Sequence, residues 1–176
     1  MIAKQLADLI TFLRLSLLLI LPWLAIIYSG GSLPWAGVIL ALNWTGDSLD
    51  GRLARRSGMP FHTWIGDHDL EVDMSVSLGM LIFLVICGFA RTVPVMLYAG
   101  SWAVYFRARG VPRSMGMLCQ APVYAWFIGI TLREAPLVGW GLIAWILVAL
   151  VATWPRFPQE VIPDFLAGLR NAFGGD

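Results

Sequence analysis

Four of the five aspartates between positions 47 and 73 are the residues of this sequence best suited to chemistry. Asp47 and Asp50 are three positions apart, and Asp69 and Asp73 are four positions apart. In a helix, both spacings place the members of a pair on one face. Carboxylate oxygens are the ligands that hard divalent cations prefer. If two neighbouring antiparallel helices carry the two pairs, the four acids converge and form a candidate metal site.

The apolar surroundings of these acids mean that their charge has to be compensated. A carboxylate in a membrane helix costs about 2.5–3.5 kcal/mol, and four of them cost on the order of 10 kcal/mol. A hard cation bound by all four would offset that cost. Ion pairs with Arg52, Arg55 and Arg56 are a second solution. A third is that the acids lie in water at a helix-loop-helix turn and bind nothing.

Two small residues favour a ligand over these alternatives. Gly51 and Ala54 follow Asp47 by four and seven positions, so they share its helical face and leave a gap above the carboxylates. Close packing against another helix is the rival explanation for small residues in a membrane helix. A face that carries hard anionic ligands, bare backbone and an arginine also suits a metal-bound phosphate with a nucleoside beside it.

The composition indicates that these residues belong to a membrane protein. Of the 176 residues, 59% are hydrophobic and only 13% are charged, and the mean hydropathy is +0.75. Soluble domains carry roughly 25% charged residues. The net charge of +1 gives no basis for a nucleic-acid partner. The two cysteines, Cys87 and Cys119, lie within apolar stretches and are interpreted as packing residues.

The apolar stretches predict an all-α bundle of six transmembrane helices, each close to the roughly 20 residues that cross a bilayer. Their expected ranges are 9–29, 33–54, 67–90, 92–108, 113–132 and 136–154. Short connections favour a single domain over residues 1–155. Residues 1–11 are expected to form a short interfacial helix. Residues 156–176 are expected to be an amphipathic or disordered cytoplasmic tail.

The positions of Lys and Arg predict the orientation of the bundle, because cytoplasmic loops are enriched in them. Only Arg91 and Arg133 fall on one side of the six predicted spans. The other ten fall on the opposite side, at Lys4, Arg14, Arg52, Arg55, Arg56, Arg107, Arg109, Arg113, Arg156 and Arg170. Both termini and the aspartates are therefore expected on the cytoplasmic side of a bacterial inner membrane.

The aspartate segment resembles the signature of the CDP-alcohol phosphotransferase family. The positions that match its pattern are Asp47, Asp50, Gly51, Ala54, Arg55, Asp69 and Asp73. The opening Leu9–Arg14 is similar to the residues that precede the first span in that family, and six spans with cytoplasmic termini agree with its architecture. One difference is local: the second aspartate pair comes one residue late, so Ile65 stands at a glycine position and Gly66 follows it.

The resemblance implies a reaction of phospholipid biosynthesis. A phospho-alcohol group, such as the phosphatidyl group of CDP-diacylglycerol, passes to the hydroxyl of a small alcohol or phospho-alcohol, and CMP leaves. Two Mg²⁺ or Mn²⁺ ions bridge the pyrophosphate. Asp47, Asp50 and Asp69 would be metal ligands, and Asp73 a ligand or the catalytic base. The CDP site would be lined by Asp47, Gly51, Ala54 and Arg55. Many family members are homodimers.

Three further arginines have two interpretations. Arg107, Arg109 and Arg113 are expected at the cytoplasmic level of the aspartates. They suit the phosphate of an acceptor such as glycerol phosphate or inositol phosphate. They equally suit contact with lipid head groups as markers of topology.

Two other functions are compatible with the sequence. A catalytically inactive relative that serves as a membrane binding or scaffold protein would account for Ile65 at the glycine position. A small ion transporter would account for acids within a membrane. A transporter predicts acids deep in several helices, whereas these acids gather at one end of two.

Overall fold

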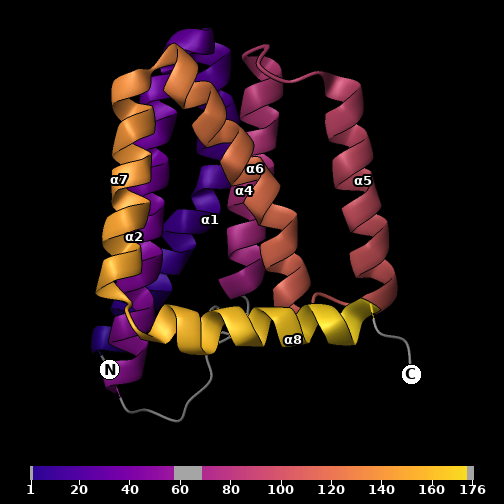
Figure 1. The fold of residues 1–176 in the computed structure, drawn as a ribbon. Helices are drawn as coiled ribbons and strands as arrows, with labels where there is room; N and C mark the ends of the chain where they lie inside the picture. The colour runs from indigo at the N-terminus through magenta and orange to yellow at the C-terminus, as the bar shows by residue number, and fades with distance from the viewer. Residues whose placement is uncertain (1, 58–68, 174–176) are drawn as a thin grey trace. The chain divides into compact units, whose positions relative to one another are not determined.

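The computed structural model describes residues 2–57 and 69–173, and the predicted all-α class is confirmed for them (Figure 1). Six long helices match the six predicted apolar stretches closely. The elements are α1 (Ile2–Tyr28), η1 (Ser29–Ser32), α2 (Leu33–Ser57), α4 (Asp69–Ile86), α5 (Thr92–Arg109), α6 (Arg113–Glu134), α7 (Pro136–Ala152), η2 (Phe157–Val161) and α8 (Ile162–Phe173).

The helix ends follow local sequence rules. Gly110, with a φ of +75°, ends α5 in the left-handed region that glycine adopts without strain. Pro112 then has an extended backbone, with a ψ of 139°, directly before α6. Pro136 begins α7, where its missing N–H has no helical partner to lose.

The N-terminal segment differs from the expectation of a separate interfacial helix. The chain is one continuous helix from Ile2 to Tyr28. No glycine or proline occurs before Pro22, so nothing in the sequence breaks the helix between the first residues and the apolar stretch. The expected interfacial helix is therefore the first part of α1.

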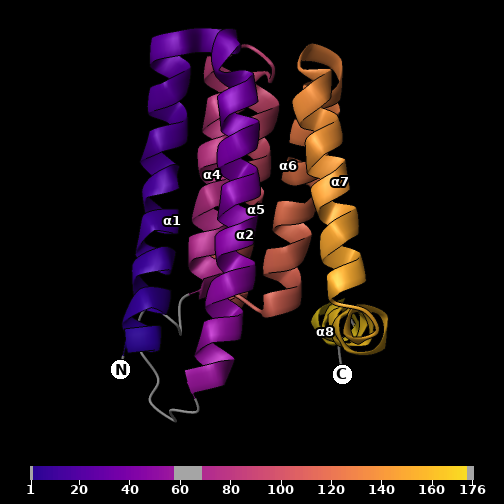
Figure 2. The same ribbon diagram turned by 90° about the vertical axis from the view of Figure 1, so that its left-hand side faces the viewer.

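The chain divides into two compact units, Met1–Arg91 and Thr92–Asp176. In the first unit, α1 and α2 form a hairpin through η1, and α4 packs along α1 (Figure 2). Gly79 makes this packing close, because a Cβ at that position would lie 3.0 Å from the Cα of Leu18 in α1. Phe83 and Leu84 of α4 are fully buried in the core of this unit. The single domain over residues 1–155 stays a prediction.

In the second unit, α6 and α7 form a tight hairpin and α8 packs across the beginning of α6. A Cβ at Gly139 would lie 2.6 Å from the backbone nitrogen of Leu132, so the hairpin requires glycine there. The Tyr98 hydroxyl of α5 donates to the backbone oxygen of Cys119 in α6, at 2.5 Å. The predicted tail contains η2 and α8, and this helical segment lies at 86° to α7 (Figure 1).

Large apolar side chains cover the outside of both units. Leu19 and Ile26 of α1 are 73% and 70% exposed, and Leu137 and Val151 of α7 are 88% and 75% exposed. By length and composition, the stretches Phe12–Ser48 and Arg113–Glu134 can cross a membrane, and α7 with the segment after it makes a third if the bent pair counts as one span. The described residues are therefore consistent with a membrane protein, and the arrangement of six spans stays a prediction.

Candidate functional site

A buried arginine lies at the centre of the candidate site in the first unit. The side chain of Arg14 is only 3% exposed, and its Nη2 lies 3.1 Å from Oδ1 of Asp47. The same nitrogen contacts Oδ1 of Asp73. Its Nε donates to Oδ1 of Asn43 at 3.2 Å. One guanidinium group thus joins two of the predicted site aspartates.

Three helices supply these groups, each for a local reason. Asn43 and Asp47 are four residues apart in α2, so both project toward α1 one turn apart. Asp73 lies one turn after the first residue of α4, which packs against α1. Asn43 is 4% exposed, and its amide oxygen accepts a hydrogen bond, so this polar group is buried with a partner.

The two carboxylates of the cluster share the guanidinium group of Arg14. Asp47 and Asp73 carry two negative charges against the one positive charge of Arg14, so these three groups keep an excess of negative charge. The carboxylates are more accessible than the arginine, because their side chains are 44% and 28% exposed. An accessible pair of convergent carboxylates has the donor chemistry for a hard divalent cation. The residues present fit the predicted metal in this respect.

A cavity of about 310 Å³ lies beside the cluster, between α1 and α2. Arg14, Asn43 and Gly46 line its end nearest Asp47, and the remaining lining residues are aliphatic: Leu13, Leu17, Ile39 and Leu42. The cavity is therefore apolar with a charged group at one end. This distribution suits a molecule with a hydrocarbon chain and a polar head.

The other predicted site residues are placed only by their backbone. Asp50, Gly51, Ala54 and Arg55 belong to the last turns of α2, and Asp69 is the first residue of α4. Their side chains lie outside the described residues, as do Ile65 and Gly66 entirely. Among the described side chains, no three His, Cys, Asp or Glu residues gather as metal ligands do. The four-aspartate metal site therefore stays a prediction. Of its four aspartates, Asp47 and Asp73 lie together in the structure, because both contact Arg14.

The three arginines predicted to bind an acceptor phosphate belong to the second unit. Arg107 and Arg109 lie in the last turn of α5, and Arg113 is the first residue of α6. All three side chains are exposed. Their role in binding an acceptor stays a prediction.

Two members of the cluster were not assigned to the site from the sequence. The sequence identifies Arg14 only as a topology marker and as part of the opening Leu9–Arg14, and it predicts no role for Asn43. Both carried a signal: each is a polar residue within an otherwise apolar stretch, and Asn43 precedes Asp47 by one helical turn. A buried polar residue on the face of a predicted metal ligand is a candidate partner for it.

No protein-family model, no characterised protein and no solved structure matches the chain.

Proposed function

We propose that this protein is a metal-dependent CDP-alcohol phosphotransferase of the membrane. The observation that carries the proposal is the meeting of Asp47 and Asp73 at Arg14. These two aspartates come from the two halves of the sequence signature, and they are 26 positions apart in the chain. Their convergence is what a shared metal-pyrophosphate site requires of the fold.

The residues of the cluster have complementary tasks in this reaction. Two bound Mg²⁺ or Mn²⁺ ions would offset the charge of the pyrophosphate and make CMP a better leaving group. Asp47 would hold them together with Asp50 and Asp69. Asp73 is a metal ligand or accepts the proton of the acceptor hydroxyl as general base. Arg14 positions Asp47 and Asp73 without itself reaching the solvent-exposed side.

The shape of the site supports a lipid donor. The cavity beside Arg14 offers aliphatic walls for an acyl chain, and its polar end lies next to Asp47. In this arrangement the phosphate nearest the chain lies beside the predicted metal ligands. The CDP group would then extend toward the end of α2, where Gly51, Ala54 and Arg55 are located. CDP-diacylglycerol has both parts.

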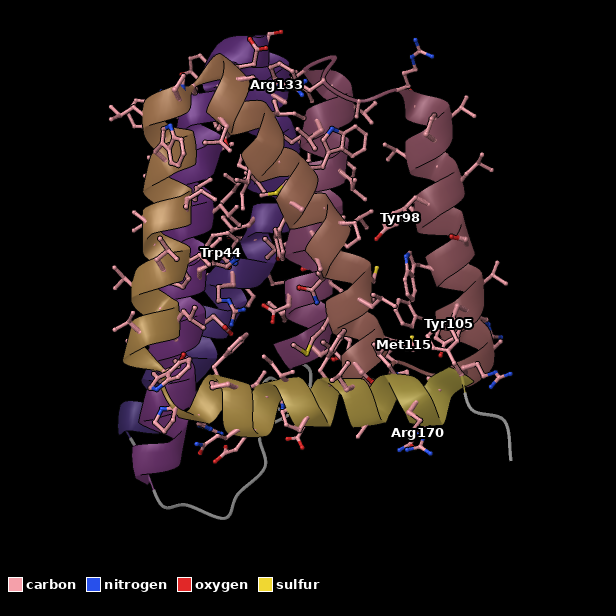
Figure 3. The ribbon with its side chains drawn as sticks, in the orientation of Figure 1. Trp44, Tyr98, Tyr105, Met115, Arg133 and Arg170 are labelled. Carbon is pink, nitrogen blue, oxygen red and sulfur yellow. The ribbon has the colours of Figure 1, made fainter. Side chains whose placement is uncertain are left out.

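The proposal includes the arrangement in the membrane. Helices α1, α2, α4, α5, α6 and α7 are the six spans, both termini are cytoplasmic, and the site opens to the cytoplasm of a bacterium. In support, Arg133 and Arg170 lie at opposite ends of the second unit, as the asymmetry of charges predicts (Figure 3). Homodimer formation is a further expectation from the family resemblance.

The test is CMP release by the purified protein in detergent, with CDP-diacylglycerol and either Mg²⁺ or Mn²⁺. Acceptors to screen are glycerol 3-phosphate, inositol phosphate, inositol, serine and glycerol. Acceptor-dependent release would establish the activity and name the product. Asp50→Asn and Asp73→Asn should each abolish it while the protein stays inserted in the membrane. The matched control is Glu71→Gln, an exposed acid on the same helix as Asp73.

Two results would count against the transferase. Activity retained in Asp50→Asn would remove the metal-site assignment. Binding of CDP-diacylglycerol without turnover, with every acceptor and both metals, would favour the inactive scaffold protein instead.

A further inference from the structure

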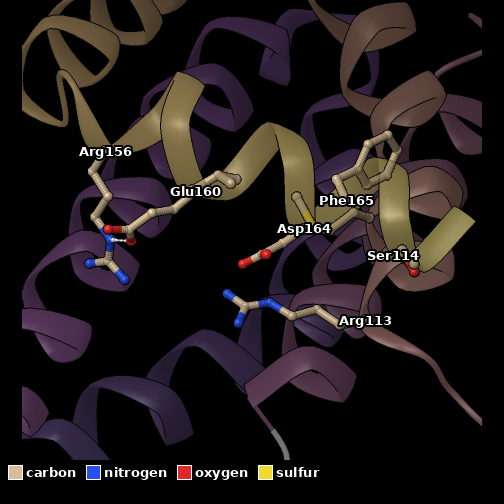
Figure 4. A pocket seen from close by; sticks show the side chains of 9 residues that line it. Arg113, Ser114, Arg156, Glu160, Asp164 and Phe165 are labelled. Atoms are coloured by element: carbon tan, nitrogen blue, oxygen red, sulfur yellow. Dashed lines mark hydrogen bonds and ion pairs between the residues drawn. The ribbon is translucent and has the colours of Figure 1, made fainter.

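A second cavity, of about 270 Å³, lies within the second unit, between the beginning of α6 and the segment formed by η2 and α8. Its charged lining residues are Arg113 of α6 and Arg156, Glu160 and Asp164 of the C-terminal segment (Figure 4). Phe165 adds an apolar wall. Of these lining residues, only Arg113 is predicted to take part in the transfer reaction, as a ligand of the acceptor phosphate.

Two of the four charged side chains form an ion pair, and the other two face one another without forming one. Nε of Arg156 lies 2.7 Å from Oε2 of Glu160, which neutralises both. Arg113 and Asp164 point toward one another across the cavity (Figure 4). In the described part of the chain, no ion pair joins these two side chains. The cavity therefore presents one positive and one negative group with a space between them.

The cavity lies at the N-terminal end of α6, a helix that can cross a membrane. Arg113 is the first residue of α6, a helix long and apolar enough to cross a bilayer. The segment Phe157–Phe173 turns by 86° from α7, so it runs along the surface if α7 crosses. On α8, the side chains of Ile162, Leu166 and Phe173 are 41%, 56% and 70% exposed. Exposed apolar residues on a surface-lying amphipathic helix enter the boundary between head groups and acyl chains.

The contact of α8 with α6 is close, and this fixes the width of the cavity. A Cβ at Gly168 would lie 2.8 Å from the Cβ of Ser114 and closer still to its Oγ. Real atoms do not approach so closely without displacement. Glycine at this position therefore lets α8 pack directly on the first turn of α6, and Arg113 is held opposite Asp164.

We propose that this cavity binds the head group of a zwitterionic phospholipid that carries a primary ammonium group. The lipid phosphate binds Arg113, and the ammonium group donates to Asp164. A purely anionic head group fits less well, because Asp164 repels it and the second cation of the cavity, Arg156, is already paired with Glu160. A quaternary ammonium group also fits less well, because it has no N–H to donate.

The test is native mass spectrometry of the full-length protein in detergent with an equimolar mixture of phosphatidylethanolamine, phosphatidylglycerol and phosphatidylcholine. Phosphatidylethanolamine should be retained preferentially. Arg113→Gln and Asp164→Asn should each reduce its retention by about tenfold, which is the value of one charge-assisted hydrogen bond. The matched control is Arg170→Gln, because Arg170 is an exposed arginine of α8 that does not line the cavity.

A second variant tests the geometry and leaves the charged groups in place. Gly168→Leu should displace α8 and lower the retention of phosphatidylethanolamine, although Arg113 and Asp164 remain. Gly141→Leu is its control, because a Cβ at Gly141 meets nothing within 4 Å. Equal retention of the three lipids would overturn the proposal, and so would preference for phosphatidylglycerol or unchanged retention in Arg113→Gln. These readouts do not depend on CMP release, so failure of the transferase assay is a separate result.

Discussion

Replacement of Arg14 by Met is the sharpest test of the cluster in the first unit. Met has a comparable unbranched side chain, so the change removes the charge and keeps much of the packing. Asp47 and Asp73 would then lose the guanidinium group that both of them contact. Loss of one partner from a buried ion pair costs about 3–5 kcal/mol, because the remaining charge is uncompensated.

The exposure of the two carboxylates reduces this value. Their side chains are 44% and 28% exposed, so water screens part of the repulsion. We expect Arg14→Met to lower the free energy of unfolding by about 2–3 kcal/mol in EDTA, which corresponds to a fall in Tm of roughly 4–12 °C for a chain of this size. In Mg²⁺ the loss should be smaller, since a divalent cation neutralises the same carboxylates.

The assay is thermal unfolding of the purified variants in detergent, with EDTA and with Mg²⁺. Arg91→Met is the matched control, because Arg91 is exposed at the connection between α4 and α5, and its Tm should stay close to that of the unchanged protein. Addition of Asp73→Asn to Arg14→Met should restore part of the stability in EDTA, because it removes one of the repelling charges. An unchanged Tm of Arg14→Met in EDTA would refute this prediction. So would a difference in Tm between Arg14→Met and the unchanged protein that is the same in Mg²⁺ as in EDTA.

Two further predictions concern packing and orientation. Gly79→Val should lower the Tm, because even a Cβ at this position would lie 3.0 Å from the backbone of α1; Gly129→Val, at a position with no neighbour within 4 Å, should have little effect. If both units have the proposed orientation, Arg133→Cys in a background without other cysteines should react with a membrane-impermeant maleimide added outside intact cells. Arg170→Cys should react only after the cells are lysed, and the reverse labelling pattern would invert the topology.

Much of the helical structure was predictable from local sequence. Runs of apolar residues bounded by Gly and Pro gave expected ranges that differ from the ends of the six long helices by a few residues, and by seven at the beginning of α1. This success has a physical reason: in an apolar solvent every backbone polar group has to be satisfied within the helix, so a long apolar stretch has few alternatives. The prediction of a separate N-terminal helix was wrong, because no glycine or proline interrupts α1 before Pro22.

The candidate site was predictable only in part. The spacing of Asp47 and Asp73 within the signature pointed to a shared site, and these two residues do meet. Arg14 as their common partner was not foreseen, because it is 59 positions from Asp73 and no local rule relates the two. Its contact with Asn43, 29 positions away, is of the same kind.

The sequence by itself determined the helical class, the apolar surface and the aspartate signature, since these depend on residue type and on spacing along the chain. The tertiary structure decided which charges meet. The packing of α4 on α1 brings Asp73 to Arg14, and the close contact at Gly168 holds Asp164 opposite Arg113. Such contacts depend on the distance between two packed helices and on the position along each helix at which they touch. These distances are set by packing between residues far apart in the chain, and hydropathy along the sequence does not contain them.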